Sequence, residues 1–173
     1  MRAVVQRVSS AAVHVDGRLV SSIGRGLCVL VGIHRNDTDG DVDYIVRKVL
    51  NLKLFDGDDG KRWRRSAREL GLEVLCVSQF TLQCTLKGNK PDFHLAMDGD
   101  RSRDFYAEFL RRMRAEHGEQ LVKDGEFGTL MQVDIRNDGP VTIELESSGF
   151  KKVPPLPQER GEPDGGVEED PNP

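Results

Sequence analysis

The spacing of apolar residues changes along the chain from strand-like to helix-like, and this change restricts the fold more than any other feature. Within residues 1–33 the segments AVVQRVSSAAVHV, RLVSSI and LCVLVGI are alternating or continuously apolar, with an Asp16-Gly17 turn and a Gly-Arg-Gly break between them. From Asp39 onward, apolar residues recur at helical spacing: Val42, Ile45, Val46, Val49 and Leu50. The chain is therefore predicted to begin with three to four strands and to continue into an amphipathic helix.

Later segments predict further strands and a second helix. Residues 52–55 are expected to form a short strand, residues 73–83 a long strand, and residues 101–117 a helix with an apolar stripe. In residues 129–146, apolar residues alternate with polar ones on both sides of an Asp-Gly pair. This pattern predicts a hairpin that turns at residues 136–140. Strands dominate without a regular βαβ rhythm, so we predict an α+β fold with β-barrel-like, curved, mostly antiparallel sheets and two outer helices.

The C-terminal 25 residues differ in composition from the rest of the chain. Residues 149–173 contain six of the eight prolines and little apolar periodicity, which predicts a disordered tail behind a folded domain of residues 1–148. Residues 1–148 contain 22 basic and 23 acidic side chains, which argues against a globally basic nucleic-acid binder. Two local basic clusters, residues 61–65 and 111–114, could still contact phosphates, although solvated surface is the simpler interpretation.

The cysteines and the absence of long apolar runs indicate a cytosolic protein. The three cysteines form no C-x-x-C pair, and Cys28 and Cys76 lie within apolar runs, so we expect reduced, structural thiols. No apolar run approaches the ~18 residues of a membrane span, and the N-terminus lacks the apolar core of a secretory signal. We expect no membrane association and a cytoplasmic location, with the nucleus left open.

The segment RNDGPVT contains one of only two prolines outside the tail. Asp138-Gly139 is a hairpin signal, yet Pro140 follows at once and lacks the amide hydrogen that a returning strand would use. Two explanations stay open: an edge strand that starts with proline, or a cis peptide bond between Gly139 and Pro140.

The segment SQFTL interrupts an otherwise apolar strand with hydrogen-bonding side chains. Burying Gln79 or Thr81 without partners would cost roughly 1–3 kcal/mol each, so they are expected either to face a polar cleft or to bond to each other. A strand that merely reaches the surface is the alternative. A nucleophilic hydroxyl needs a base, but no histidine stands at a suitable spacing. No zinc spacing or phosphate-binding glycine loop is present either, so we expect no metal and no cofactor.

Four segments, MRAVVQRV, SQFTL, LKGNKPDFH and NDGPVT, together resemble the D-aminoacyl-tRNA deacylases, also called D-tyrosyl-tRNA deacylases, over residues 1–148. The resemblance implies a homodimer with its active site at the subunit interface. It also implies hydrolysis of the ester that joins a D-amino acid, or glycine, to the terminal adenosine of tRNA. Selection would act by rejecting L-amino acids rather than by recognising side chains.

The same resemblance assigns roles to individual residues. The catalytic set is Ser78, Gln79, Phe80 and Thr81, and the substrate-binding set is Leu82, Met131, Arg7, Gly139 and Pro140. Gly139-Pro140, which we call the gate, is implied to be cis and to reach into the partner's pocket, with Arg7 supporting it. We expect the backbone N–H groups of Phe80 and Thr81 to stabilise the oxyanion and the ribose 2′-hydroxyl to assist the attacking water. Whether Thr81 is a nucleophile or only positions the substrate stays open.

Two other functions compete with this one. A non-catalytic nucleic-acid-binding or scaffolding protein would use the basic clusters and the tail and would bind without turnover. A related deacylase with relaxed stereochemistry would act on L-aminoacyl-tRNA; in such relatives the strand motif begins with Pro-Gln and the Gly-Pro bond is trans. Ser78-Gln79 and the gate match the D-specific pattern instead.

Overall fold

The computed structural model describes residues 1–147. The predicted tail, residues 149–173, and the domain boundary at residue 148 lie outside the described residues. In chain order the elements are β1 (Arg2–Val15), β2 (Arg18–Ile23), β3 (Gly26–Gly32), α1 (Asp39–Asn51), α2 (Ala67–Leu70), β4 (Glu73–Ser78), the 3₁₀ helix η1 (Phe80–Gln83), β5 (Thr85–Lys87), β6 (Lys90–Asp92), α3 (Gly99–His117), the 3₁₀ helix η2 (Glu119–Leu121), β7 (Val122–Asp124) and β8 (Gln132–Glu146).

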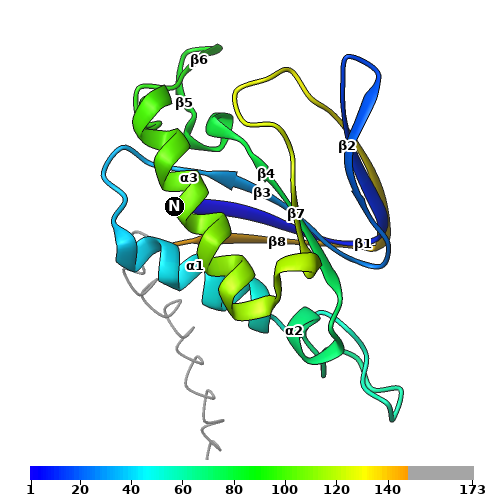
Figure 1. The fold of residues 1–173 in the computed structure, drawn as a ribbon. Coiled ribbons are helices and arrows are strands. Elements are labelled where there is room, and N and C mark those ends of the chain that lie inside the picture. The colour runs from blue at the N-terminus through cyan, green and yellow to red at the C-terminus, as the bar shows by residue number, and fades with distance from the viewer. Residues whose placement is uncertain (148–173) are drawn as a thin grey trace, which may run out of the picture.

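The main sheet is mixed and strongly curved. Its strand order is β2-β1-β3-β4-β7, and β8 pairs with β1. Strand β1 is antiparallel to β2, β3 and β8, whereas β4 is parallel to both β3 and β7. Figure 1 shows β1, β2 and β8 bending away from the helices, so the sheet approaches a closed barrel. The predicted α+β, barrel-like class is confirmed. The sheet is mixed but mostly antiparallel, and its parallel pairs are β3–β4 and β4–β7. Helix α1 lies in the crossover that makes β3 and β4 parallel.

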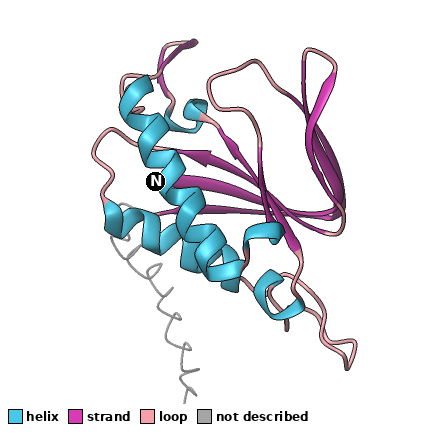
Figure 2. Ribbon diagram, viewed as in Figure 1, coloured by secondary structure: helices cyan, strands magenta, loops and turns pink. Residues whose placement is uncertain are grey.

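Two long helices cover one face of this sheet (Figure 2). Helix α1 begins after Thr38, whose amide donates to Asp41 Oδ2 at 2.8 Å, and it buries all five predicted apolar residues. The apolar stripe predicted for helix α3 consists of Phe105, Phe109, Leu110 and Met113. The last three are buried, Phe105 is only partly buried, and Tyr106 is buried besides. A third helix, the four-residue α2, was not predicted, because one turn is too short to show a helical period.

The interior consists of two hydrophobic clusters, one on each face of β3 and β4. The helix-side cluster contains Leu27 and Val29, whereas the inner cluster contains Cys28 between them. Alternate residues of β3 therefore face the two clusters, which explains why its sequence is continuously apolar. Strands β1 and β8 each contribute to both clusters. Val5 and Ile143 pack in the helix-side cluster. The residues of the same strands that pack in the inner cluster are Val8, Val13, Val133 and Ile135.

The change of cluster coincides with an irregularity in the β1–β8 ladder. Arg7 pairs with Val141 and Val8 pairs with Asn137, so residues 138–140 form a bulge with no partner on β1. The predicted hairpin at residues 136–140 is therefore wrong. Strand β1 is long enough to pair with both apolar halves, so β8 continues as one strand and the Asp-Gly pair occupies the bulge. The Gly139-Pro140 peptide bond is cis, as predicted.

The remaining predictions concern smaller features. Of the strand expected at residues 52–55, only an isolated bridge from Phe55 to Arg65 is present, because no longer strand runs beside it. Cys28 and Cys76 are buried free thiols, and burial raises the pKa of Cys28 to about 11. No helix within residues 1–147 has both the length and the apolar character needed to cross a bilayer.

Candidate active site

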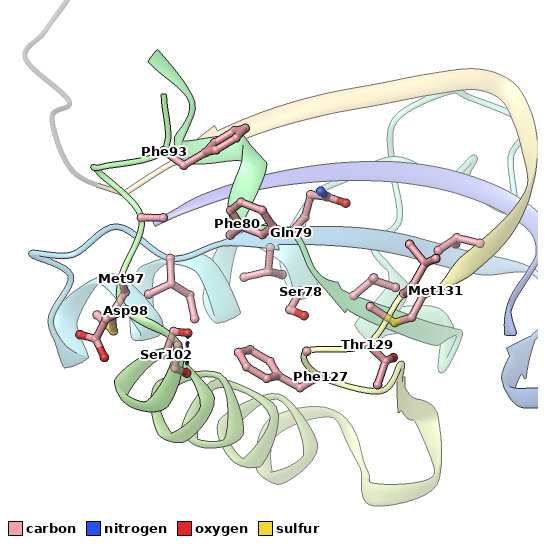
Figure 3. Close-up of a pocket in the computed structure, with 18 residues that line it drawn as sticks. Ser78, Gln79, Phe80, Phe93, Met97, Asp98, Ser102, Phe127, Thr129 and Met131 are labelled. Carbon is pink, nitrogen blue, oxygen red and sulfur yellow. Dashed lines mark hydrogen bonds between the residues drawn. The ribbon is translucent and has the colours of Figure 1, made fainter. Parts of the chain in front are cut away.

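A cavity of about 720 Å³ lies where the ends of β3 and β4 meet η1, the start of α3 and the loop before β8 (Figure 3). Its lining is mainly apolar and aromatic, with a few polar groups, as is usual for small-molecule sites. In Figure 3, Ser78 and Phe80 face Phe127 and Ser102 across the opening. The cavity brings together residues 78–80 with segments that are far away in sequence.

The SQFTL segment turns out of the sheet instead of continuing it. Strand β4 ends at Ser78, the Gln79 amide donates to the Val31 carbonyl at 2.7 Å, and η1 follows. The predicted strand over residues 73–83 is wrong beyond Ser78, because its neighbour β3 ends at Gly32 and offers no further backbone partners. Gln79 and Thr81 therefore do not share a strand face.

Gly32 allows η1 to pack closely on the end of β3. A Cβ atom at Gly32 would lie 2.7 Å from Leu82 Cβ and 2.9 Å from the Gln79 carbonyl oxygen, so only glycine fits without displacing η1. The buried side-chain amide of Gln83 donates to the Gly32 carbonyl at 2.9 Å. These contacts fix where the polar groups of the segment stand.

The five SQFTL side chains have different surroundings. Ser78, Gln79 and Phe80 line the cavity, whereas Thr81 and Leu82 do not. Thr81 is nevertheless linked to it, because Gln79 Nε2 donates to Thr81 Oγ1 at 2.5 Å. This bond matches the expectation that Gln79 and Thr81 satisfy each other. Phe80 is 58% exposed, and its ring meets that of Phe93 edge-on with centroids 5.1 Å apart.

The backbone at the start of η1 offers hydrogen-bond donors. Phe80 and Thr81 are its first two residues, and the first amides of a helix have no acceptor within it. These two N–H groups directly follow the cavity-lining residues Ser78 and Gln79 in the chain, which makes them the candidate donors to an oxyanion.

The opposite wall was not predicted from the sequence. It comes from the start of α3, where Asp98 accepts from the Arg101 amide at 3.2 Å as the N-cap, and from residues 127–131. Phe127 packs on buried Tyr106 with ring centroids 5.6 Å apart, and Met131, a predicted binding residue, lines the cavity. The clustered segment GEFGTLM was the available signal, since glycines flank an aromatic residue there outside any periodic pattern.

Conventional acid–base and metal groups are not assembled around this cavity. No histidine is among its lining side chains, and the histidine nearest in sequence to SQFTL, His94, contacts Asp92 Oδ1 at 2.6 Å instead. Asp98 is the one carboxylate in the lining. Within residues 1–147 no three His, Cys, Asp or Glu side chains converge to hold a metal ion.

The gate does not border this cavity. Gly139 and Pro140 are exposed and neither belongs to the cavity lining. Arg7, only 16% exposed, holds the bulge: its Nε donates to the Asp138 carbonyl at 3.2 Å and lies 3.1 Å from Asp138 Oδ2. Its Nη1 donates to the Leu54 carbonyl at 2.6 Å. The predicted site residues thus divide into two groups, one at the cavity and one at the bulge.

Comparison with known proteins decides the family. The family model described as D-Tyr-tRNA(Tyr) deacylase matches residues 4–146, nearly the whole of the described chain. The chain belongs to this family.

Curated relatives and solved structures agree with membership of the D-Tyr-tRNA(Tyr) deacylase family. "D-aminoacyl-tRNA deacylase 1" of Bos taurus is 58% identical over 147 residues, which are 85% of this chain and 70% of the relative. "D-aminoacyl-tRNA deacylase" of Drosophila melanogaster is also 58% identical, over 85% of this chain and 92% of the relative. The solved structure of a "c-Myc DNA Unwinding Element Binding Protein" has a TM-score of 0.84 and 56% identity, and covers 86% of this chain and 100% of its own.

The two basic clusters differ in how many of their arginine and lysine side chains form ion pairs with acidic residues. In the cluster at residues 111–114, Arg112 contacts Asp39, Asp43 and Glu108, and Arg114 contacts Asp124. These arginines serve the fold by linking α3 to its neighbours. The cluster at residues 61–65 is more exposed and only partly paired.

Proposed function

We propose that residues 1–148 form a D-aminoacyl-tRNA deacylase that hydrolyses the ester between a D-amino acid and the terminal adenosine of tRNA. Membership of the deacylase family, with SQFTL at the edge of the 720 Å³ cavity, carries this proposal. The same family membership makes the chain a hydrolase that removes mischarged amino acids. Glycyl-tRNA is included as a substrate, because glycine has no side chain for the site to reject.

In the proposed reaction, water attacks the ester carbonyl and the backbone amides of Phe80 and Thr81 stabilise the resulting oxyanion. As the water oxygen bonds to the carbonyl carbon, the water proton passes to the ribose 2′-oxygen, and the proton of the 2′-hydroxyl passes to the departing ester oxygen. The ester C–O bond then breaks, which releases the amino acid and leaves the ribose with both hydroxyls. This route suits a cavity whose lining contains no histidine. Thr81, held by the Gln79 amide, positions the backbone and the substrate rather than forming an acyl-enzyme.

The proposed active unit is a homodimer in which each gate completes the partner's cavity. Two observations support this: the gate is exposed, and it is absent from the lining of its own protomer's cavity. In this arrangement the carbonyls of Gly139 and Pro140 accept hydrogen bonds from the substrate ammonium group. The gate backbone then stands where an L side chain would project, so L-amino acids are rejected by steric exclusion.

The deciding experiment compares hydrolysis of D- and L-tyrosyl-tRNA, with glycyl-tRNA as a third substrate, by the full-length chain. We expect release of D-tyrosine and glycine and at least a hundredfold slower release of L-tyrosine. Equal rates on the two tyrosyl esters would contradict the proposal that the gate excludes L-amino acids. Absence of turnover on all three substrates would contradict the proposed deacylase activity.

Nucleic-acid binding without catalysis is the alternative. The observation in its favour is the likeness to a solved protein that is named for binding a DNA unwinding element. This function predicts that DNA and uncharged tRNA bind as tightly as D-aminoacyl-tRNA and that no ester is cleaved. The same preparation, tested for binding and turnover, separates the two functions.

A further inference from the structure

Trp63 is an exposed aromatic residue that the proposed chemistry does not use. It is 50% exposed and adopts a positive φ of 61°, which is uncommon for a residue with a side chain. The Phe55 carbonyl accepts from the amides of both Arg64 and Arg65, at 2.9 and 3.0 Å. Two amides on one carbonyl are the pattern of a β-bulge, which fixes the backbone directly after Trp63. The indole is therefore held at the surface by the backbone of the surrounding loop.

The loop around Trp63 presents cations that nothing in the described chain neutralises. Among its charged residues, Lys61 pairs with Asp59 at 3.2 Å and Arg65 with Asp58 at 3.6 Å. Arg62 and Arg64 are exposed and form no ion pair within residues 1–147. Asp56 is the one unpaired acid of the loop, so two arginines flank the indole with a net positive charge.

Arg7 places this loop beside the gate. Its guanidinium lies 5.9 Å from the centre of the Trp63 ring, and its Nη2 lies 3.2 Å from the position of a Cβ atom on Gly139. Trp63 and Gly139 therefore border the same side chain. No residue of the loop lines the cavity of its own protomer.

From this geometry we infer that Trp63, Arg62 and Arg64 of one subunit bind the single-stranded 3′ nucleotides of the tRNA whose ester occupies the partner's cavity. The inference rests on the proposed function, because the gate brings its neighbouring loop to the partner's cavity only in that dimer. The nucleotides that precede the terminal adenosine carry phosphates and unpaired bases. An aromatic face between arginines binds such a strand by stacking a base and pairing the phosphates.

The test compares a full substrate with a minimal one. Trp63→Ala and Arg62→Ala/Arg64→Ala are assayed in the full chain on D-tyrosyl-tRNA and on D-tyrosyl-adenosine, which lacks the preceding nucleotides. Trp63→Ala should lower kcat/KM on the tRNA about tenfold and leave the adenosine ester unchanged. The double arginine variant should weaken the salt dependence of tRNA binding by a slope of roughly 1.4. Trp63→Phe, which keeps an aromatic face, should restore most of the activity.

Mixed dimers test whether the loop acts across the interface. One subunit carries Trp63→Ala with an intact cavity. The other carries an intact loop with a cavity filled by Ser78→Trp, a variant first shown to be inactive as a homodimer. A loop acting in trans keeps this dimer active on D-tyrosyl-tRNA, whereas loss of that activity would overturn the trans arrangement.

The outcomes distinguish this inference from the function on which it rests. Trp63→Ala with wild-type activity on tRNA overturns the inference and leaves the deacylase intact. An equal fall in kcat/KM on D-tyrosyl-tRNA and on D-tyrosyl-adenosine also overturns the inference, because Trp63 would then act through Arg7 and the gate. If the wild type cleaves neither substrate, the proposed function fails, and the inference fails with it.

Discussion

The side-chain amide of Gln79 donates a hydrogen bond to the hydroxyl oxygen of Thr81 at 2.5 Å, across the point where β4 gives way to η1. The bond occupies one lone pair of the Thr81 oxygen and leaves the hydroxyl proton free to donate elsewhere. The bond therefore links Gln79, whose side chain lines the cavity, to Thr81, the residue whose hydroxyl is the candidate nucleophile.

If Thr81 positions groups and does not attack, its loss should slow the reaction without abolishing it. Thr81→Ala should lower kcat about tenfold, since one hydrogen bond contributes roughly 1–1.5 kcal/mol. Thr81→Ser, which keeps the hydroxyl, should retain most of the activity, and Thr142→Ala, on an exposed position of β8, serves as the control. Complete inactivity together with an acyl adduct trapped on Thr81 would establish it as the nucleophile.

The proton route makes a prediction about the substrate. D-tyrosyl-tRNA ending in 2′-deoxyadenosine should be cleaved at least a hundredfold more slowly than the normal substrate, because general acid–base assistance contributes roughly 10²–10⁴-fold. Binding of the two substrates, measured with an excess of enzyme, should be similar. Unimpaired cleavage of the deoxy substrate would rule out assistance by the 2′-hydroxyl.

Gly32→Ala should displace η1 from the end of β3. A new Cβ atom would meet the Gln79 carbonyl, which is backbone and cannot rotate away, so we expect a loss of about 1–3 kcal/mol in unfolding free energy and a larger proportional loss of kcat. Gly24→Ala is the matched control, because its Cβ would meet only Glu73 at 3.8 Å. Denaturant titration and single-turnover rates measure the two effects, and an unchanged kcat would contradict the positioning of η1 by Gly32.

Arg7→Lys should loosen the bulge that carries the gate. One ammonium group cannot replace a guanidinium that donates to both Leu54 and Asp138, so we expect a stability loss of about 2 kcal/mol. The ratio of D- to L-tyrosyl-tRNA hydrolysis should fall, chiefly through faster cleavage of the L-ester. Arg18→Lys, at an exposed arginine of β2, should leave that ratio unchanged.

Glu108 should make the packing of α3 on α1 sensitive to acid. Hydrogen bonds from Arg111, and then from Arg112, lower the pKa of Glu108 from 4.5 to about 2. Because the folded-state pKa is the lower one, its stabilisation is present above pH 4.5 and is lost as the pH falls toward 2. Glu108→Gln should therefore flatten the fall in Tm between pH 4.5 and 2. Asp104→Asn, an exposed carboxylate of the same helix, should leave the profile unchanged.

Periodicity predicted the elements that bury a regular apolar face. The three N-terminal strands and helices α1 and α3 could be predicted because the spacing of apolar residues within each element shows which face is buried. Val42 and Phe109 are examples of such buried residues. The turn at SQFTL could not be predicted in this way, because it depends on where the neighbouring strand β3 ends. Similarly, the Asp138-Gly139 pair has the chemistry of a hairpin turn, and only the length of β1 makes it a bulge.

The cavity illustrates the same limit. The polar interruption of an apolar strand singled out Ser78 and Gln79, and the resemblance to the deacylases added Phe80 and Met131. All four residues line the cavity. Asp98 and Ser102, on the opposite wall, carry no such local signal, because their position arises from the packing of α3 against the sheet. Phe127 had only the signal of its flanking glycines. The division of the predicted residues between cavity and gate also required the tertiary structure.

The crossing of β1 and β8 between the two hydrophobic clusters has a consequence for how selectivity can change over time. The gate stands at the boundary where Val5 and Ile143 belong to one cluster and Val8 and Ile135 to the other. We expect a substitution that alters the packing of either cluster to shift one half of each strand relative to the other half, with the unpaired residues 138–140 taking up the difference. Chiral fidelity is therefore expected to decline at mildly destabilising core substitutions before the protein unfolds, so error-prone variants can arise far from the substrate.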